Sequence, residues 1–430
     1  MATSHPKRTP LSSYQRRGFW AAWGGWALDG MDSFIYALVL TPAVTDLLPR
    51  SGIEATAANI GYYGSLLLAL FMIGWGLSMA WGPLADRFGR IRTLMLTIAC
   101  YSLFTFLGAF VTNVWQLGAC RLLAGIGIGG EWSMGGTYVA EAWPEHRRAE
   151  GAGYMHSGYY FGFFLAAIAN FSIGAHHGWR WMFALGGLPA LLVGFIRYGV
   201  REPERWEKRA AAHQYPTMYA AFAALFSKRY ARRTLLNSLF LLISVVGLWA
   251  GSVYVPTSVM QLASGAGYTA QEAAKLASYG TMVLSVGTIL GCLALPLLAE
   301  RAGRRATLGI FFLLMFFSIA IGFGYVFYLS TNALAWFFVV LFFLGLGGAN
   351  FAIYTLWLPE QYDTSCRASA FAFTTSVGRF AGAGITFLVG NAVARYGSLG
   401  TPIALTSLAF LVGLFLLPLG EETKGRALPS

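Results

Sequence analysis

The sequence is dominated by long apolar stretches that are separated mostly by short loops. A helix needs about 20 mostly apolar residues to cross the hydrocarbon core of a membrane, and twelve stretches of the 430-residue chain meet this need. The stretches cover residues 18–47, 59–83, 93–112, 114–141, 149–174, 179–200, 231–262, 270–299, 306–329, 332–359, 367–396 and 399–419. Charged residues make up only 11% of the chain, which is too few to cover a soluble surface. We therefore predict an all-α membrane protein with twelve transmembrane helices.

The basic residues are distributed unequally between the two sets of loops. Of the 30 Lys and Arg residues, few fall in loops on the side opposite the N-terminus. These few are Arg50, Arg180, Lys275 and Arg395. Because loops rich in Lys and Arg stay in the cytoplasm, we expect a multi-pass protein of the cell inner (plasma) membrane with both termini cytoplasmic. The net charge of +12 then faces the anionic inner leaflet, and no soluble basic face remains for nucleic acid.

The chain repeats itself in two halves. Residues 84–90 (LADRFGR) and 298–304 (LAERAGR) carry an acidic residue, Arg, Gly and Arg at the same positions, and the two segments lie about half the chain length apart. The one long polar stretch, 201–230, separates two sets of six apolar stretches. We therefore divide the chain into a tail (1–17), a six-helix bundle (18–200), a cytoplasmic linker (201–230), a second six-helix bundle (231–419) and a second tail (420–430). Parallel repeats of this kind place a binding site between the halves, near the membrane midplane.

Several motifs resemble those of the major facilitator superfamily. Residues 82–92 (GPLADRFGRIR) are similar to its loop motif between helices two and three, and 121–129 (RLLAGIGIG) to its helix-four motif. Residues 201–206 (REPERW) and 421–425 (EETKG) resemble segments of its sugar porters. The resemblance covers nearly the whole chain. It implies two pseudo-symmetric six-helix bundles that transport a solute by alternating access.

A narrower resemblance concerns proton symporters of organic acids. Residues 28–32 (LDGMD) are similar to the helix-one motif of the aromatic-acid and sialate/lactate proton symporters. Residues 129–132 (GGEW) and 138–144 (YVAEAWP) resemble the sialate/lactate branch, whereas Gly378-Arg379 is more similar to the aromatic-acid branch. The resemblance implies symport of an organic acid and leaves the acid open.

Helix one carries two acidic residues within its apolar stretch. Asp29, Asp32 and Tyr36 are spaced so that they share one helix face. Ionisable groups inside a membrane usually mark ion or substrate paths, and a carboxyl group removed from water is easier to protonate. At 1.5 Å per residue, Asp32 and Arg121 lie at the same depth, so we expect them to pair, either for proton coupling or as a purely structural bridge. Glu131 is interpreted as a second proton site or a part of the inner gate.

Arg379 is the candidate for binding a substrate carboxylate. A guanidinium is always charged and grips a carboxylate with two parallel hydrogen bonds. We expect Arg379 to lack an acidic partner, because Asp29 and Asp32 belong to the opposite half; the alternative is that it binds backbone carbonyls. Further candidates for the cavity wall are His156, Tyr159, Trp249, Tyr254, Asn350 and Tyr354. Each of these is otherwise an ordinary core or interface residue.

The repeated loop motifs are interpreted as gates. Asp86 is expected to bond the end of a helix in the opposite half, and Arg90 to bind Glu141 or its neighbours. Such contacts form when the inner side closes and break when it opens. The candidate gate residues are Asp86, Arg87, Arg90, Glu141, Glu300, Arg301 and Arg304. The alternative is that these residues are solvated loop charges that set the topology.

Together these features predict a proton-coupled symporter that imports a small organic anion. We expect a monocarboxylate such as lactate or pyruvate, or an aromatic or sugar acid, carried by a monomer in the lipid bilayer. No phosphate-binding Gly-Lys-Ser/Thr loop and no metal-ligand spacing occur in the sequence, so we expect no ATP, cofactor or metal. The alternatives are a sugar or other metabolite porter, a nutrient receptor that does not transport, and an intramembrane enzyme. The enzyme would need a nucleophile–base arrangement that the sequence does not offer.

Overall fold

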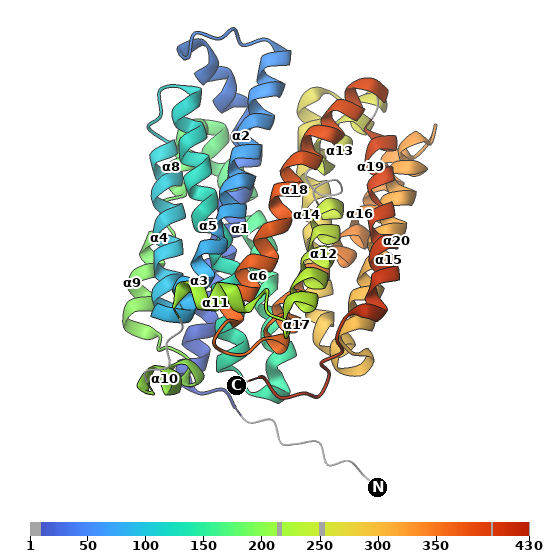
Figure 1. Cartoon of the computed structure of the whole chain (residues 1–430). Helices are drawn as coiled ribbons and strands as arrows, with labels where there is room; N and C mark the ends of the chain where they lie inside the picture. The colour runs from blue at the N-terminus through green and yellow to red at the C-terminus, as the bar shows by residue number, and fades with distance from the viewer. Residues whose placement is uncertain (1–9, 213–216, 249–253, 397–398, 430) are drawn as a thin grey trace.

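The computed structural model describes residues 10–212, 217–248, 254–396 and 399–429. Within these ranges the regular structure is helical, without strands. Figure 1 shows two helix bundles side by side, with α1 to α9 in one and α12 to α20 in the other. We call the end that carries loop 84–90 the inner end, because it is predicted to face the cytoplasm, and the opposite end the outer end.

The N-terminal bundle is built from long helices and a few short ones. Its elements are α1 (Ser13–Arg50), α2 (Ala57–Leu77), α3 (Trp81–Phe88), α4 (Arg90–Gly108), α5 (Val114–Ala142), α6 (Arg148–Ala169), α7 (Ala175–His177), α8 (Trp179–Leu185) and α9 (Ala190–Gly199). The first helix begins with a capping box, in which Ser12 and Gln15 each bond the other's backbone amide. This arrangement satisfies two of the amides that a helix start leaves unpaired.

The C-terminal bundle repeats this pattern. Its elements are α12 (Ala231–Leu248), α13 (Val255–Gly265), α14 (Ala270–Ala302), α15 (Arg304–Gly324), α16 (Ala333–Gly348), α17 (Asn350–Trp357), α18 (Arg367–Tyr396), α19 (Gly400–Thr406) and α20 (Leu408–Leu416). Thr269 and Glu272 form a capping box at the start of α14, as Ser12 and Gln15 do for α1.

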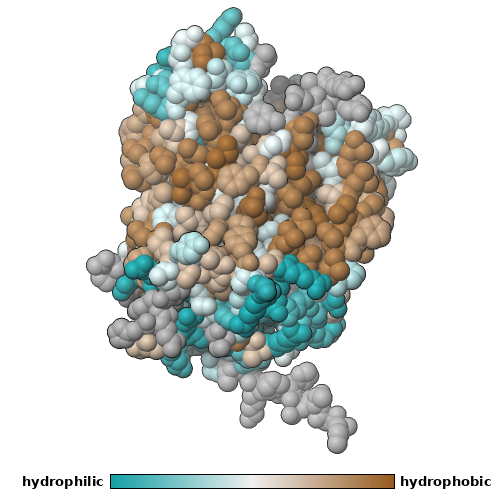
Figure 2. Space-filling model, in the orientation of Figure 1, coloured by the Kyte–Doolittle hydropathy of each residue, from teal (hydrophilic) through white to brown (hydrophobic). Residues whose placement is uncertain are grey.

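Each predicted stretch coincides with one helix or with consecutive helices. Eight of the described helices or helix pairs are long and apolar enough to cross a membrane by length and composition. The remaining four stretches correspond to α5, α6, α12 with α13, and α18. Charged or titratable candidates for the site lie on α5, α6 and α18. Figure 2 shows an apolar band across the middle of the visible face, between polar surfaces at its two ends. This band fits a membrane protein.

The linker between the bundles contains structure that the sequence analysis did not predict. Two short helices, α10 (Glu204–Ala211) and α11 (Met218–Ala224), lie at the inner end. Helix α11 contacts α3 of one bundle and α18 of the other. The linker therefore lies across the boundary between the halves.

The halves meet along two seams, α2 against α18 and α6 against α14. Glycine permits the close approach at the inner end of the first seam. A Cβ atom at Gly82 would lie 2.6 Å from the Cα atom of Ser369 in the other half, which is closer than two carbons can approach. A side chain at this position would therefore force the halves apart.

Candidate transport site and inner gate

The acidic face of α1 is buried within the N-terminal bundle. Asp29 and Asp32 are both inaccessible to solvent. Arg121 Nη1 of α5 lies 4.0 Å from Asp32 Oδ2, so the structure brings together the two residues whose depths matched. The Arg121 guanidinium also lies over two aromatic rings, 4.2 Å from the centroid of Tyr36 and 4.4 Å from that of Phe71. Such stacking compensates part of the lost hydration of the cation.

A cavity of about 340 Å³ lies between the halves. On α1 its wall runs from Trp26 to Thr41, a length of about 22 Å that extends from the middle of the helix toward the outer end. Most of the wall is aromatic: Trp26, Phe34, Tyr36, Phe71, Trp75, Trp132, His156, Tyr159, Tyr160, Phe163, Tyr254 and Phe351. Its size fits a small metabolite.

Among the described residues that line this cavity, Arg379 is the only charged one. Its guanidinium carbon lies 3.8 Å from the centroid of Trp75, and among the described residues no carboxylate forms an ion pair with it. Asp29 of the opposite half interacts with Arg379 electrostatically but does not form an ion pair with it. The arginine is thus partly compensated, and its side chain remains on the cavity wall.

The other candidates divide into two groups. Tyr36, His156, Tyr159 and Tyr254 line the cavity. Asn350 and Tyr354 are not among the residues of the wall. Asn350 Nδ2 donates to the Gly347 carbonyl at 2.8 Å while its Oδ1 has no partner among the described residues, and the Tyr354 hydroxyl lies 2.9 Å from that of Ser244. Trp249 lies outside the described residues.

Sequence reasoning missed the tryptophans of the wall. Trp132 of α5 lies among Trp26, His156 and Phe351, and its Nε1 donates to Thr355 Oγ1 of the other half at 2.9 Å. Aromatic residues make up 16% of the chain, so aromatic character alone could not single these residues out. The signal for Trp132 was its position directly after Glu131.

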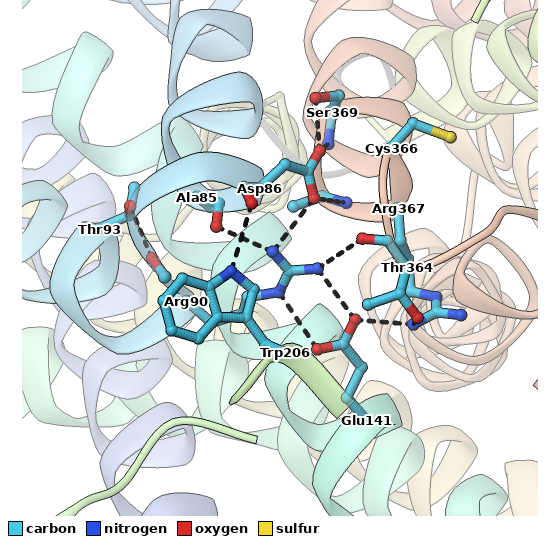
Figure 3. Close-up of polar contacts among 12 residues, drawn as sticks. Ala85, Asp86, Arg90, Thr93, Glu141, Trp206, Thr364, Cys366, Arg367 and Ser369 are labelled. Carbon is cyan, nitrogen blue, oxygen red and sulfur yellow. Dashed lines mark hydrogen bonds and ion pairs between the residues drawn. The ribbon is translucent and has the colours of Figure 1, made fainter. Parts of the chain in front are cut away.

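The inner end is closed by a buried polar network that Figure 3 shows. Asp86 accepts hydrogen bonds from the backbone amides of Ala368 and Ser369 and from the Ser369 hydroxyl, at 3.3, 2.9 and 2.6 Å. It thereby caps the start of α18, which belongs to the other half. The negative charge at this helix start is favourable.

The last arginine of each repeated motif holds an equivalent glutamate of its own half. Arg90 binds Glu141 through two hydrogen bonds of 3.1 and 3.0 Å, and Arg304 binds Glu360 through two of 2.9 and 2.8 Å. Arg367 of the C-terminal half reaches Glu141 at 2.7 Å. These pairs are buried, so removing one partner leaves a charge uncompensated.

Three other candidate gate residues lie outside this buried network. Arg87 and Arg301 are exposed, and Arg87 stacks on Phe88 instead. Glu300 corresponds to Asp86 in the repeat, but its side chain is 54% exposed and binds only Arg304 of its own half among the described residues. The two halves therefore do not contribute equally to the inner closure.

Two bundles related by an internal repeat, with a cavity between them and ionisable groups at its base, define a membrane transporter. A model of the Major Facilitator Superfamily matches residues 22–386. The chain belongs to this superfamily.

The similar proteins are metabolite transporters. The chain is 32% identical to a protein of Cupriavidus pinatubonensis named "Probable 4-methylmuconolactone transporter", over 97% of this chain and 93% of that one. It is 28% identical to the niacin transporter NiaP of Acinetobacter baylyi, over 99% and 98%. The proton:xylose symporter XylE, solved with 6-bromo-6-deoxy-D-glucose, superposes with a TM-score of 0.77 over 97% and 98% at 19% identity. The similarity to XylE supports the fold alone.

Proposed function

We propose that the protein is a proton-coupled symporter that imports a planar, unsaturated monocarboxylate across the cell inner membrane. Arg379 on an aromatic cavity wall carries this proposal. The guanidinium offers a planar fork that matches a carboxylate, and the rings beside it offer flat apolar faces that match a conjugated or aromatic body. Methylmuconolactone and niacin, in the names of the relatives, are compatible with this class.

The proposal names a narrower class of substrates than the organic acids that the sequence left open. Lactate and pyruvate are small and would leave most of the aromatic wall without contacts. A sugar acid would place several hydroxyl groups against ring faces, which are poor acceptors of hydrogen bonds, and unpaired polar groups are costly to bury. A neutral sugar would leave the Arg379 fork unused as well. The cavity therefore favours one carboxylate on an apolar plane.

Proton coupling is assigned to the buried carboxyl groups Asp29, Asp32 and Glu131, with Arg121 as the partner of Asp32. In the alternating-access cycle, the contacts around Asp86 and Glu141 hold the inner end closed while substrate and proton enter from the outer side. They separate when both are bound, and the cavity then opens to the cytoplasm. No covalent chemistry is needed for this cycle.

The test is uptake of radiolabelled compounds into proteoliposomes with and without an imposed pH gradient, inside alkaline. The panel comprises benzoate, nicotinate, muconate, lactate, pyruvate, sialic acid and xylose. We expect accumulation of one or more planar unsaturated monocarboxylates, with a dependence on the gradient. Accumulation of xylose alone, or of acids without dependence on the gradient, would contradict the proposal.

A further inference from the structure

The N-terminal half buries more negative than positive groups around α1. Asp32 is matched by Arg121 at 4.0 Å, and Asp29 interacts electrostatically with Arg379. The third carboxyl group, that of Glu131, is also inaccessible to solvent. Among the described residues neither Asp29 nor Glu131 forms an ion pair, but only Glu131 also lacks an electrostatic contribution from an arginine, so it is the surplus acid of the group.

The Glu131 side chain is closely packed between α1 and α4 and is inaccessible to solvent. Its Oε1 atom has no hydrogen-bond partner and lies against Gly25 of α1, where a Cβ atom would collide with it. Its Oε2 atom lies 3.4 Å from Thr97 Oγ1 of α4. This hydroxyl is therefore the one polar contact that the described residues give the carboxyl group.

The hydroxyl proton of Thr97 has a better acceptor elsewhere. Thr97 Oγ1 lies 2.8 Å from the carbonyl oxygen of Leu94, and a hydroxyl has only one hydrogen to donate. Toward Glu131, 3.4 Å away, Thr97 can then donate at most a weak, shared hydrogen bond. A neutral Glu131 can instead donate its own hydrogen to the Thr97 oxygen, whereas an ionised one would be left with little compensation, which is costly in a buried site.

We infer that Glu131 is the group that carries the transported proton while the inner end is closed. This inference rests on the proposed symport and assigns its proton to one of three carboxyl groups. The charged and titratable groups around it agree with the assignment. On α1 these are Asp29 and Asp32, and on α4 the Tyr101 hydroxyl, which interacts electrostatically with all three carboxyls and has no hydrogen-bond partner. The guanidiniums of Arg121 on α5 and Arg379 on α18 are directed to the two aspartates.

The position of Glu131 suits release of the proton on the inner side. Along α5 it lies about 15 Å closer to the inner end than Arg121. The next residue, Trp132, is bonded to Thr355 of the other half, so Glu131 lies just behind the seam that separates when the inner end opens. Water that enters there can accept the proton from the carboxyl group, which leaves a carboxylate that is then hydrated.

Infrared spectroscopy of the purified protein in lipid nanodiscs tests the protonation directly, without any substrate. We expect the carbonyl stretch of a protonated carboxylic acid in the wild-type protein and its loss in Glu131→Gln. The matched control is Glu300→Gln, which removes an ion-paired carboxylate outside the buried closure and should leave the band unchanged. Thr97→Val keeps the acid and removes its acceptor, so the band should move to higher frequency. A band that persists in Glu131→Gln overturns the inference.

Transport then tests whether this proton is the coupled one. Glu131→Gln should retain substrate exchange in counterflow and lose accumulation driven by the pH gradient. Loss of the infrared band with unchanged gradient-driven accumulation would overturn the coupling role. If no acid of the panel is transported by the wild type, the proposed function fails instead, and the infrared result remains interpretable by itself.

Discussion

Arg148 and Arg367 occupy equivalent positions in the two halves, and each reaches across to the glutamate of the other half. Arg367 Nη1 lies 2.7 Å from Glu141, and Arg148 Nη1 lies 3.4 Å from Glu360. Each glutamate is also held by an arginine of its own half, Arg90 or Arg304. The inner closure is thus two interlocked copies of one arrangement, in which the contact across the halves is shorter at Glu141 than at Glu360.

Cys366 offers a native reporter of this closure. It precedes Arg367 and is almost fully buried, and burial, together with nearby Asp86 and Asp363, raises the pKa of its thiol to about 12. Because only the thiolate reacts, labelling by a membrane-impermeant maleimide should be very slow at neutral pH while the inner end is closed. When it opens, the pKa returns toward its ordinary value and labelling becomes faster.

The first prediction concerns Glu141→Gln. The substitution leaves Arg90 and Arg367 without their shared carboxylate, and breaking a buried ion pair costs about 3–5 kcal/mol. The closed state should therefore lose population, and Cys366 should label at least tenfold faster in a variant that has the other three cysteines replaced. Unchanged labelling would show that the network does not hold the inner end closed.

The second prediction compares the two repeat motifs. Asp86→Asn removes the charge that caps α18, an effect of about 1 kcal/mol for a helix cap, and should both slow transport and speed Cys366 labelling about fivefold. Its matched control is Glu300→Gln at the equivalent, half-exposed position of the other half. This control should change neither rate, because exposed ion pairs contribute little. Equal effects of both substitutions would contradict the asymmetric closure.

The third prediction concerns Glu422, which follows the last helix. Its carboxylate accepts hydrogen bonds from the backbone amides of Arg304 and Arg305 at 2.9 and 3.2 Å. Burial opposes its ionisation, but these bonds and the Arg304 charge outweigh it and hold the pKa of Glu422 below its ordinary value. The ionised cap therefore stabilises the fold at neutral pH, and this contribution is lost as the pH falls through the lowered pKa.

Glu422→Gln should accordingly lower the free energy of unfolding by about 1 kcal/mol at pH 7. The measurement is thermal unfolding in detergent, with wild type and variant compared at pH 7 and at acidic pH. Their difference should shrink in acid. The matched position is Glu202, which accepts bonds from Arg90, Ile91 and Arg92 but is buried enough that its pKa is raised. Glu202→Gln should therefore cost less at pH 7 than Glu422→Gln.

The sequence predicted the helices well and their interruptions poorly. Length and hydropathy suffice to locate a span, but the break between α2 and α3 depends on Ser78, whose hydroxyl bonds the Trp75 carbonyl at 2.6 Å and lies 3.0 Å from the hydroxyl of Ser376 in the other half. A contact with a residue so distant in the chain leaves no local signal. The linker helices were missed for a similar reason, since α11 packs on α3 and α18 of the two halves and α10 packs on α5.

Site residues of types that are rare within the spans could be predicted from the sequence, whereas site residues of common types could not. Asp29, Asp32, Arg121 and Arg379 stood out because few charges occur in the spans, and the structure brings Asp32 and Arg121 together as the rise per residue suggested. Asn350 and Tyr354 were chosen by residue type alone, and residue type does not show which side of a helix faces the cavity. The structure was needed to find Trp75 beside Arg379.

The last prediction concerns that pair. Arg379→Lys keeps the charge and loses the planar fork, so it should weaken binding of the transported acid about tenfold, or about 1.4 kcal/mol. Arg379→Ala should weaken it further, because charge-assisted hydrogen bonds contribute about 1.5–3 kcal/mol. Trp75→Leu removes the ring on which the guanidinium lies, 3.8 Å away, and should weaken binding by a smaller factor, since the arginine remains but is less firmly oriented. Isothermal titration with the purified protein measures all three.

The control is Tyr254→Phe on the same cavity wall, which keeps the aromatic surface and should leave the affinity near that of the wild type. Wild-type affinity of Arg379→Ala for the transported compound would show that this arginine does not bind the substrate.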